Sequence, residues 1–97
     1  MVNKKMIINE IGKRRNQLRA RGVKKIGLFG SYLKGTQKRG SDIDFLVTLE
    51  KKDIGKNYFE VLFYLRNLFN RKIDLVATQS LRPELNYVRE KAVYVEI

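Results

Sequence analysis

The chain has 97 residues, a formal net charge of +11 and no cysteine, and 43% of its residues are hydrophobic. This length and composition predict one globular domain over residues 1–97, and they exclude a disulfide framework. No apolar run approaches the roughly 20 residues of a membrane span, and no signal-peptide core follows the charged N-terminus. We therefore expect a cytoplasmic protein without a membrane partner.

The positive charge is concentrated in the first part of the chain. Residues 1–40 hold 12 of the 21 Lys and Arg residues and one acid, whereas residues 41–97 hold nine basic and nine acidic residues. This asymmetry predicts a polyanionic partner: a nucleoside triphosphate, an RNA or an acidic protein surface. The alternative is a solvated basic helix without a binding role.

The first predicted elements are two short strands, each preceded by a helix. Residues 4–20 have the pattern of an amphipathic helix. Residues 25–29 form a buried strand that ends at a glycine. A short helix over 31–36 then precedes a second strand over 43–49, which is almost continuously apolar, as buried strands are.

The second half of the chain predicts two further helices and a third strand. After a polar loop at 51–56, residues 57–70 form a helix that is apolar on more than one face. Such a helix either docks a protein partner with its second face or is wrapped by its own domain. Residues 73–77 form the third strand, and Pro83 begins a last helix that ends near residue 92.

Residues 93–97 are a tail or a short strand. The order α-β-α-β-α-β-α predicts a small α/β fold, with a three-stranded mixed sheet and flanking helices.

Asp42 and Asp44 are the first candidates for a functional site. Residues i and i+2 of a strand point to the same face, so the two carboxylates would project side by side. Like charges so close are costly unless a cation neutralises them. Two hard divalent ions about 3.5–4 Å apart need shared oxygen ligands of this kind. The pattern therefore predicts a metal-dependent, nucleotide-handling site.

Asp74 is the third candidate, because its strand repeats the order apolar, Asp, apolar, apolar. If the strand of Asp74 pairs with that of Asp44, three carboxylates converge at one edge of the sheet. That geometry suits nucleotidyl transfer with two Mg²⁺ ions. We expect Asp74 to act as the general base or as a ligand of the first metal.

Gly30 and Ser31 are the candidates for phosphate binding. A glycine lets a phosphate oxygen approach the backbone closely. Ser31 offers a hydroxyl and a free N–H at the start of a short helix. Among the basic residues that follow, we expect one or two to contact phosphates and assign Lys34 and Arg39 to this role.

The segments 30–35 (GSYLKG) and 41–47 (SDIDFLV), with the later Asp74, resemble the signature of the DNA polymerase β-like nucleotidyltransferase superfamily. The size of the chain and the lack of a second domain are similar to the minimal nucleotidyltransferases (MNT proteins), which are often encoded beside HEPN-domain proteins. The resemblance covers residues 23 to 76. It implies the small nucleotidyltransferase fold, Gly30 and Ser31 as triphosphate binders, and the three aspartates as the catalytic Mg²⁺ ligands.

One residue departs from the family pattern. Leu33 stands where the family commonly has a small residue, which could reshape the nucleotide pocket but removes no reacting group.

The resemblance also implies a function. MNT proteins act as antitoxins of HEPN toxins, and some transfer AMP from ATP to a tyrosine of the toxin. We therefore expect a Mg²⁺-dependent protein adenylyltransferase that forms a hetero-oligomer with a HEPN toxin. Two alternatives stay open: a non-catalytic antitoxin that acts by binding alone, and a nucleotidyltransferase whose acceptor is an RNA or a small molecule.

Overall fold

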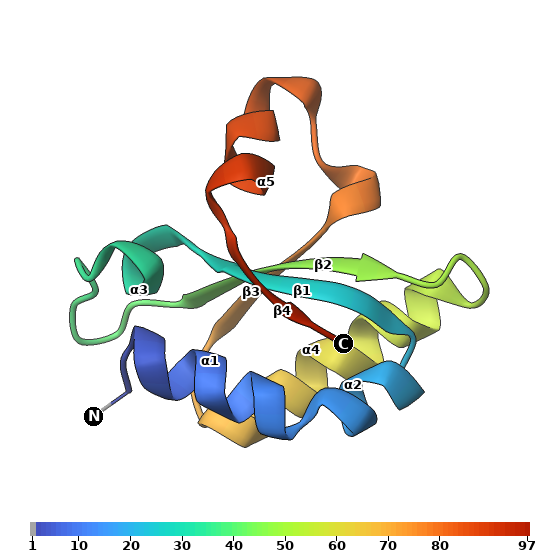
Figure 1. Cartoon of the computed structure of the whole chain (residues 1–97), viewed down its shortest axis with the longest axis horizontal. Helices are drawn as coiled ribbons and strands as arrows, with labels where there is room; N and C mark the ends of the chain where they lie inside the picture. Colours follow the sequence, from blue (N-terminus) through green and yellow to red (C-terminus); the bar gives the residue numbers. More distant parts are fainter. Residues whose placement is uncertain (1) are drawn as a thin grey trace.

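The computed structural model describes residues 2–97. The protein folds into a four-stranded sheet with helices packed against it (Figure 1). In chain order the elements are α1 (Lys4–Lys13), α2 (Arg15–Ala20), β1 (Val23–Phe29), α3 (Gly30–Lys34), β2 (Ile43–Leu49), α4 (Ile54–Phe69), β3 (Ile73–Ala77), the 3₁₀ turns η1 (Thr78–Ser80) and η2 (Pro83–Leu85), α5 (Asn86–Lys91) and β4 (Val93–Glu96). None of the described helices has the length and apolarity needed to cross a membrane.

The sheet is mixed, as expected, but it has four strands rather than three. The strand order is β3-β2-β1-β4. β1 pairs antiparallel with both β2 and β4, whereas β2 and β3 are parallel. The fourth strand is the segment expected as a tail or a short strand. It covers the free edge of β1, whose N–H and C=O groups would otherwise have no partner.

Three predicted helix boundaries are corrected by the structure. The helix expected over 4–20 is broken at Arg14, whose N–H is shared between the carbonyl groups of Glu10 and Ile11, as is common at helix ends. α4 begins at Ile54, so it takes up part of the loop expected at 51–56. Pro83 opens a 3₁₀ turn, and α5 follows as a separate short helix.

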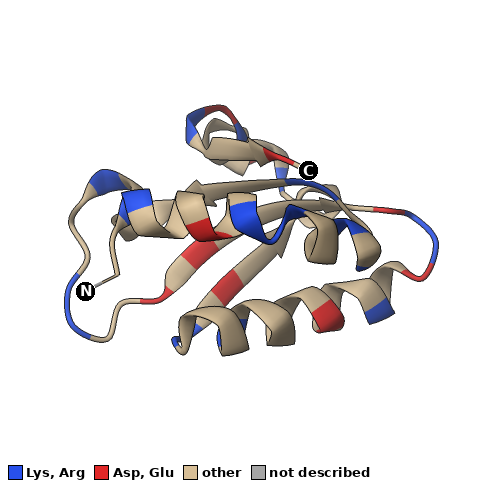
Figure 2. Ribbon diagram, turned by 60° about the horizontal axis from the view of Figure 1, so that its bottom comes forward, with Lys and Arg blue, Asp and Glu red and all other residues tan. Residues whose placement is uncertain are grey.

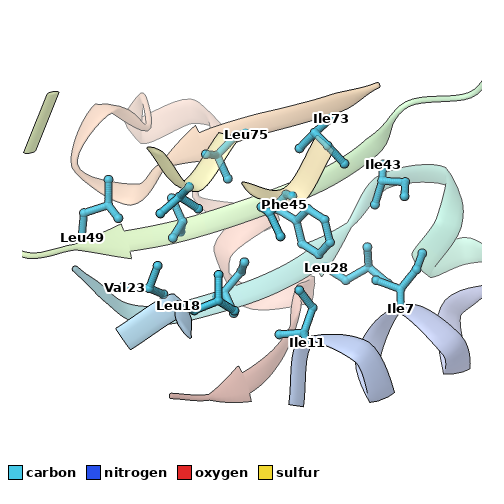
Figure 3. Packing of buried hydrophobic residues seen from close by; sticks show 14 of the residues in the cluster. Ile7, Ile11, Leu18, Val23, Leu28, Ile43, Phe45, Leu49, Ile73 and Leu75 are labelled. Atoms are coloured by element: carbon cyan, nitrogen blue, oxygen red, sulfur yellow. The ribbon is translucent and has the colours of Figure 1, made fainter. Parts of the chain in front are cut away.

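The core lies between the sheet and the helices α1, α2 and α4 (Figure 3). Alternate residues of β2 enter this core, with Phe45 at its centre in stacked contact with Phe69 of α4. Because strand residues alternate between faces, Asp44 projects from the opposite face. The apolar pattern that buries Phe45 therefore also fixes the side on which the carboxylate appears.

The opposite face of the sheet is partly covered by the segment from η1 to α5 (Figure 1). Two hydrogen bonds anchor its start: Thr48 Oγ1 lies 2.9 Å from Thr78 Oγ1, and Gln79 Nε2 donates to the carbonyl oxygen of Leu49 at 2.8 Å. Farther along, the hydroxyl of Tyr94 donates to the carbonyl oxygen of Arg89 at 2.6 Å. On this face, Asp74 near the start of β3 is exposed and Asp44 of β2 is half-buried.

α4 is not fully wrapped by the chain. Its Val61 and Leu65 are buried, but Phe59 and Phe63 are 56% and 54% exposed. The two exposed rings stack at 6.5 Å between centroids. The second apolar face predicted for this helix is therefore open to a partner.

Candidate active site

The register between β2 and β3 creates the site. The two parallel strands pair Asp44 directly with Asp74. The N–H of Ile43 donates to the carbonyl oxygen of Lys72 at 3.0 Å, which holds this register at the edge where the carboxylates lie. Neighbouring residues in register share a face of the sheet, so the two side chains meet and hydrogen-bond to each other. The predicted pairing of these strands is confirmed.

The carboxylate of Asp44 is destabilised in its charged form. Burial, the hydrogen bond with Asp74 and the negative charges of Asp74 and Asp42 raise its pKa from 3.8 to about 6, against a hydrogen bond from the backbone N–H of Ser31. In the absence of a cation, Asp44 therefore keeps its proton to a higher pH than an ordinary aspartate does.

Gly30 is essential to the shape of the site for a reason that the sequence pattern did not reveal. Its φ of +76° lies in the left-handed region, and a Cβ at this position would lie 2.7 Å from the carboxyl carbon of Asp44. Any side chain would therefore displace Asp44 from its place beside Asp74. The next residue, Ser31, turns its N–H toward the same carboxylate.

The other predicted contacts lie around this centre. Lys34 is exposed in the last turn of α3, and Arg39 is exposed in the loop before β2. A phosphate contact of either residue stays a prediction. Leu33, the departure from the family pattern, is partly buried and packs against the core cluster.

The donor set of the site suits a divalent cation. Carboxylate oxygens are the ligands of hard cations such as Mg²⁺, and the charges that act on Asp44 are both negative. Within residues 2–97, however, no three His, Cys, Asp or Glu side chains are gathered as ligands of one ion. The structure brings Asp44 and Asp74 together with Asp42 exposed beside them, and metal binding by all three stays a prediction.

Sequence reasoning missed two residues near the site, Arg71 and Lys72. They form the turn that leads into β3, and the carbonyl group of Lys72 receives the hydrogen bond that sets the register. The available signal was a pair of basic residues immediately before the strand of the third aspartate. Sequence alone does not show their place, because the fold brings them into one cavity wall with Lys38 and Arg39 of a loop distant in sequence.

A model of a protein family described as "Nucleotidyltransferase domain" matches residues 6–95. The chain belongs to this family. The prediction of a minimal nucleotidyltransferase of the DNA polymerase β-like superfamily is thereby confirmed, and so is the prediction of an enzyme. The predicted number of strands is corrected: the sheet has four strands instead of three.

Individual relatives of this nucleotidyltransferase are similar over most of its length. "Protein adenylyltransferase MntA" of Thermococcus cleftensis is 39% identical over 84% of each chain. A chain in a crystal structure of a toxin-antitoxin with AMP-PNP is 28% identical, with a TM-score of 0.65 over 88% of this chain and 70% of that one.

A third similarity shows the fold alone. A chain in the complex of a tri-AMPylated Shewanella oneidensis HEPN toxin with an MNT antitoxin is 23% identical. Its TM-score is 0.55, over 84% of this chain and 64% of that chain.

The close approach of Gly30 to Asp44 predicts that alanine substitutions at two glycines with left-handed φ values, Gly30 and Gly35, have different effects on catalysis. Gly35 has a φ of +75° but open space around a new Cβ, so Gly35→Ala meets only the backbone strain, about 1–2 kcal/mol. Gly30→Ala meets the same strain and also displaces Asp44. We expect Gly30→Ala to lower nucleotidyl transfer by about 100-fold, whereas Gly35→Ala retains it. Equal transfer rates in the two variants would show that Gly30 does not position the carboxylate.

The raised pKa of Asp44 predicts a pH-dependent cost to stability in the absence of divalent ions. Because the pKa is about 6 in the fold against 3.8 for the ordinary group, the folded state binds more protons between these values and loses stability as the pH rises. The stability gained by Asp44→Asn should therefore grow from about pH 4 to about pH 6 and then level off. Urea denaturation at several pH values measures it.

The control for this pH series is Asp53→Asn, at an exposed aspartate after β2. A stability difference for Asp44→Asn that is constant over the pH range would contradict the raised pKa of Asp44.

Proposed function

We propose that this protein is a Mg²⁺-dependent protein adenylyltransferase that transfers AMP from ATP to a tyrosine hydroxyl of a HEPN toxin and so acts as its antitoxin. The observation that carries the proposal is the pairing of Asp44 with Asp74 beside Gly30 and Ser31. The names of the relatives support the acceptor class: a protein adenylyltransferase, and a toxin-antitoxin with a nucleotide analogue.

The proposed reaction is a displacement at the α-phosphorus of ATP. The phenol oxygen of the acceptor tyrosine forms a bond to this phosphorus, the bond to the bridging oxygen of the β-phosphate breaks, and pyrophosphate leaves. Asp74 takes the phenol proton as the acceptor attacks. Ser31 and Gly30 hold the triphosphate through the backbone at the start of α3, with a contact from Lys34 or Arg39.

Asp42, Asp44 and Asp74 would hold Mg²⁺, and any proton on Asp44 would be lost when the cation binds. The bound metal would supply the charge that lowers the pKa of the attacking hydroxyl and stabilises the leaving pyrophosphate.

The exposed face of α4 is the surface that would contact the toxin. Phe59 and Phe63 stack on it, and the guanidinium of Arg66 lies 5.9 Å from the ring centroid of Phe63. A groove of about 410 Å³ adjoins the helix and is lined mainly by apolar residues, among them Ile54, Tyr58 and Leu75. Aromatic rings and Arg are the residues that dominate binding energy at protein interfaces.

The direct test of catalysis is incubation with ATP, Mg²⁺ and a HEPN toxin, followed by intact mass and peptide mapping. We expect AMP on a toxin tyrosine. The double variant Asp42→Asn/Asp44→Asn should lose transfer by at least about 100-fold but should still bind the toxin, because neither residue belongs to α4. Asp53→Asn serves as the matched control and should transfer normally.

Two results would contradict this account. Neutralisation of the toxin that survives the double substitution would favour an antitoxin that acts by binding alone. AMP on an RNA or a small molecule but on no protein would favour a different acceptor.

The docking face has its own test in the same complex. Phe63→Ser should weaken toxin binding by at least about 10-fold, since truncated hot-spot residues cost more than 1 kcal/mol. Met6→Ser is the control, because Met6 is also exposed, at 47%, but lies on α1. Surface plasmon resonance measures both. Equal affinities would place the toxin on another face.

A further inference from the structure

β3 is an edge strand, and one side of its backbone has no partner strand among residues 2–97. The carbonyl oxygen of Lys72 accepts the N–H of Ile43 and therefore faces β2. The backbone groups of alternate strand residues point to opposite edges, so those of Ile73, Leu75 and Ala77 face outward. An uncovered edge of this kind is a template for a further strand.

A second observation agrees with this assignment of the outer edge. The hydroxyl of Tyr58, on α4, donates to the carbonyl oxygen of Leu75, so this carbonyl group does point away from β2. A carbonyl oxygen has two lone pairs, and it can accept another hydrogen bond from an added strand. The N–H groups of Leu75 and Ala77 are the donors that the edge offers to the same strand.

The apolar groove of about 410 Å³ lies between this edge and α4. Its two sides are formed by Leu75, Val76 and Ala77 of β3 and by Ile54, Tyr58 and Phe59 of α4. Extended peptides bind a sheet edge as an added strand, in which main-chain hydrogen bonds give affinity and pockets for alternate side chains give specificity. The edge of β3 and the groove together supply both parts of such a site.

The same strand carries the base of the proposed reaction. Asp74 directly precedes Leu75, and successive residues of a strand point to opposite faces. Leu75 is buried on the face that α4 covers, so Asp74 projects from the other face. Figure 2 shows the acidic segments of β2 and β3 side by side, with α4 below them. A strand added to β3 would therefore pass Asp74 and the groove together.

The charges near this edge favour an acidic partner over a second copy of the chain. No charged residue lines the groove. Lys56 follows the lining residue Gly55, and Arg71 and Lys72 precede β3, whereas the ion pairs found among residues 2–97 are those of Glu10. These cations match a segment that is apolar in the middle and acidic at its ends. Two copies, each with a net charge of +11, would repel each other.

We propose that the edge of β3 and the adjoining groove bind an extended, acidic segment of the toxin as an added strand, and that this strand presents the acceptor tyrosine to Asp74. The inference rests on the proposed adenylyltransferase function and specifies how its acceptor binds.

The proposed strand fixes the spacing of side chains in the acceptor. Residues opposite each other on paired strands share a face, so a tyrosine opposite Asp74 lies on the face of the carboxylates. The residues on either side of the tyrosine then point toward the groove, because side chains alternate. The acceptor should therefore carry an apolar side chain at an odd number of residues from its tyrosine.

Hydrogen exchange measured by NMR tests the added strand in the complex of the full chain with a HEPN toxin. Toxin binding should slow the exchange of the Leu75 and Ala77 N–H groups by at least about 10-fold, since each gains a hydrogen bond. β4 is the control, because it is the edge strand on the other side of the sheet, and its exchange should not change. A bound toxin that leaves the exchange of both β3 groups unchanged would overturn the proposal.

A proline at the edge tests the same contact by mutation. Ala77 has a φ of −77°, which proline adopts without strain, so Ala77→Pro removes an outward N–H and no donor to β2. We expect toxin affinity to fall by at least about 5-fold, for the loss of one hydrogen bond, and affinity for ATP to stay unchanged. Ala77→Val keeps the N–H at a similar volume and should bind the toxin normally. Equal toxin affinities of the two folded variants would contradict the added strand.

Model substrates test the predicted spacing. The probes are short acidic peptides with one tyrosine and one leucine, placed one to four residues apart in either order. With ATP and Mg²⁺, peptides with a spacing of one or three should accept AMP at least about 10-fold faster than those with two or four, because only the former place the leucine in the groove. Equal rates at odd and even spacings, or no transfer to any peptide where the toxin accepts AMP, would refute delivery of the tyrosine along β3.

The two proposals fail in different ways. A wild-type protein that places no AMP on the toxin would refute the adenylyltransferase function, and the delivery of a tyrosine along β3 would fail with it. Normal AMP transfer to the toxin, together with unprotected N–H groups in β3 and normal toxin binding by Ala77→Pro, would refute the added strand alone.

Discussion

The contact between two carboxyl groups, Asp44 and Asp74, is the constraint on which the rest of the site depends. Like charges at hydrogen-bonding distance are unfavourable in water and more so when partly buried, yet the parallel register of β2 and β3 forces them together. The strands hold this register because alternate residues on their other face, Phe45 among them, are locked into the core. Burial on one face therefore sustains electrostatic strain on the other. That strain raises the pKa of Asp44, and in our proposal Mg²⁺ relieves it when the enzyme works.

Three different kinds of surface lie in this small domain: the acidic pair itself, a basic cavity beside it and an apolar helix face. Gly30 leaves room for Asp44 and brings Ser31 to the start of α3, where phosphates bind favourably. The cavity lined by Lys38, Arg39, Arg71 and Lys72 concentrates positive charge on the neighbouring side. An exposed apolar surface lies elsewhere, on α4. In our proposal, the acidic, basic and apolar surfaces serve a metal, a polyphosphate and a protein partner, respectively.

Much of this arrangement was predictable from the sequence, for physical reasons that differ between its parts. Strands 43–49 and 73–77 were predictable because continuous apolar runs bounded by polar residues are local signals, and their matched Asp positions predicted the register of Asp44 with Asp74. β4 was uncertain because a four-residue edge strand is decided by the free edge of a strand distant in sequence. The boundary of α4 was missed because Ile54 follows lysines and an aspartate that are typical of a loop. The cavity could not be predicted, since its cations come from two segments that meet only in the fold.

The most direct measurement of the central claim is a ¹³C NMR titration of the carboxyl carbon of Asp44, with and without Mg²⁺. Without the ion, Asp44 should titrate near its raised pKa of about 6. With Mg²⁺ bound, this carboxyl group should stay ionised through that range, and its titration should move to lower pH. An ordinary titration of Asp44 near pH 4 without the ion, or a titration that Mg²⁺ leaves unchanged, would contradict the account of a carboxylate pair built to hold a divalent cation.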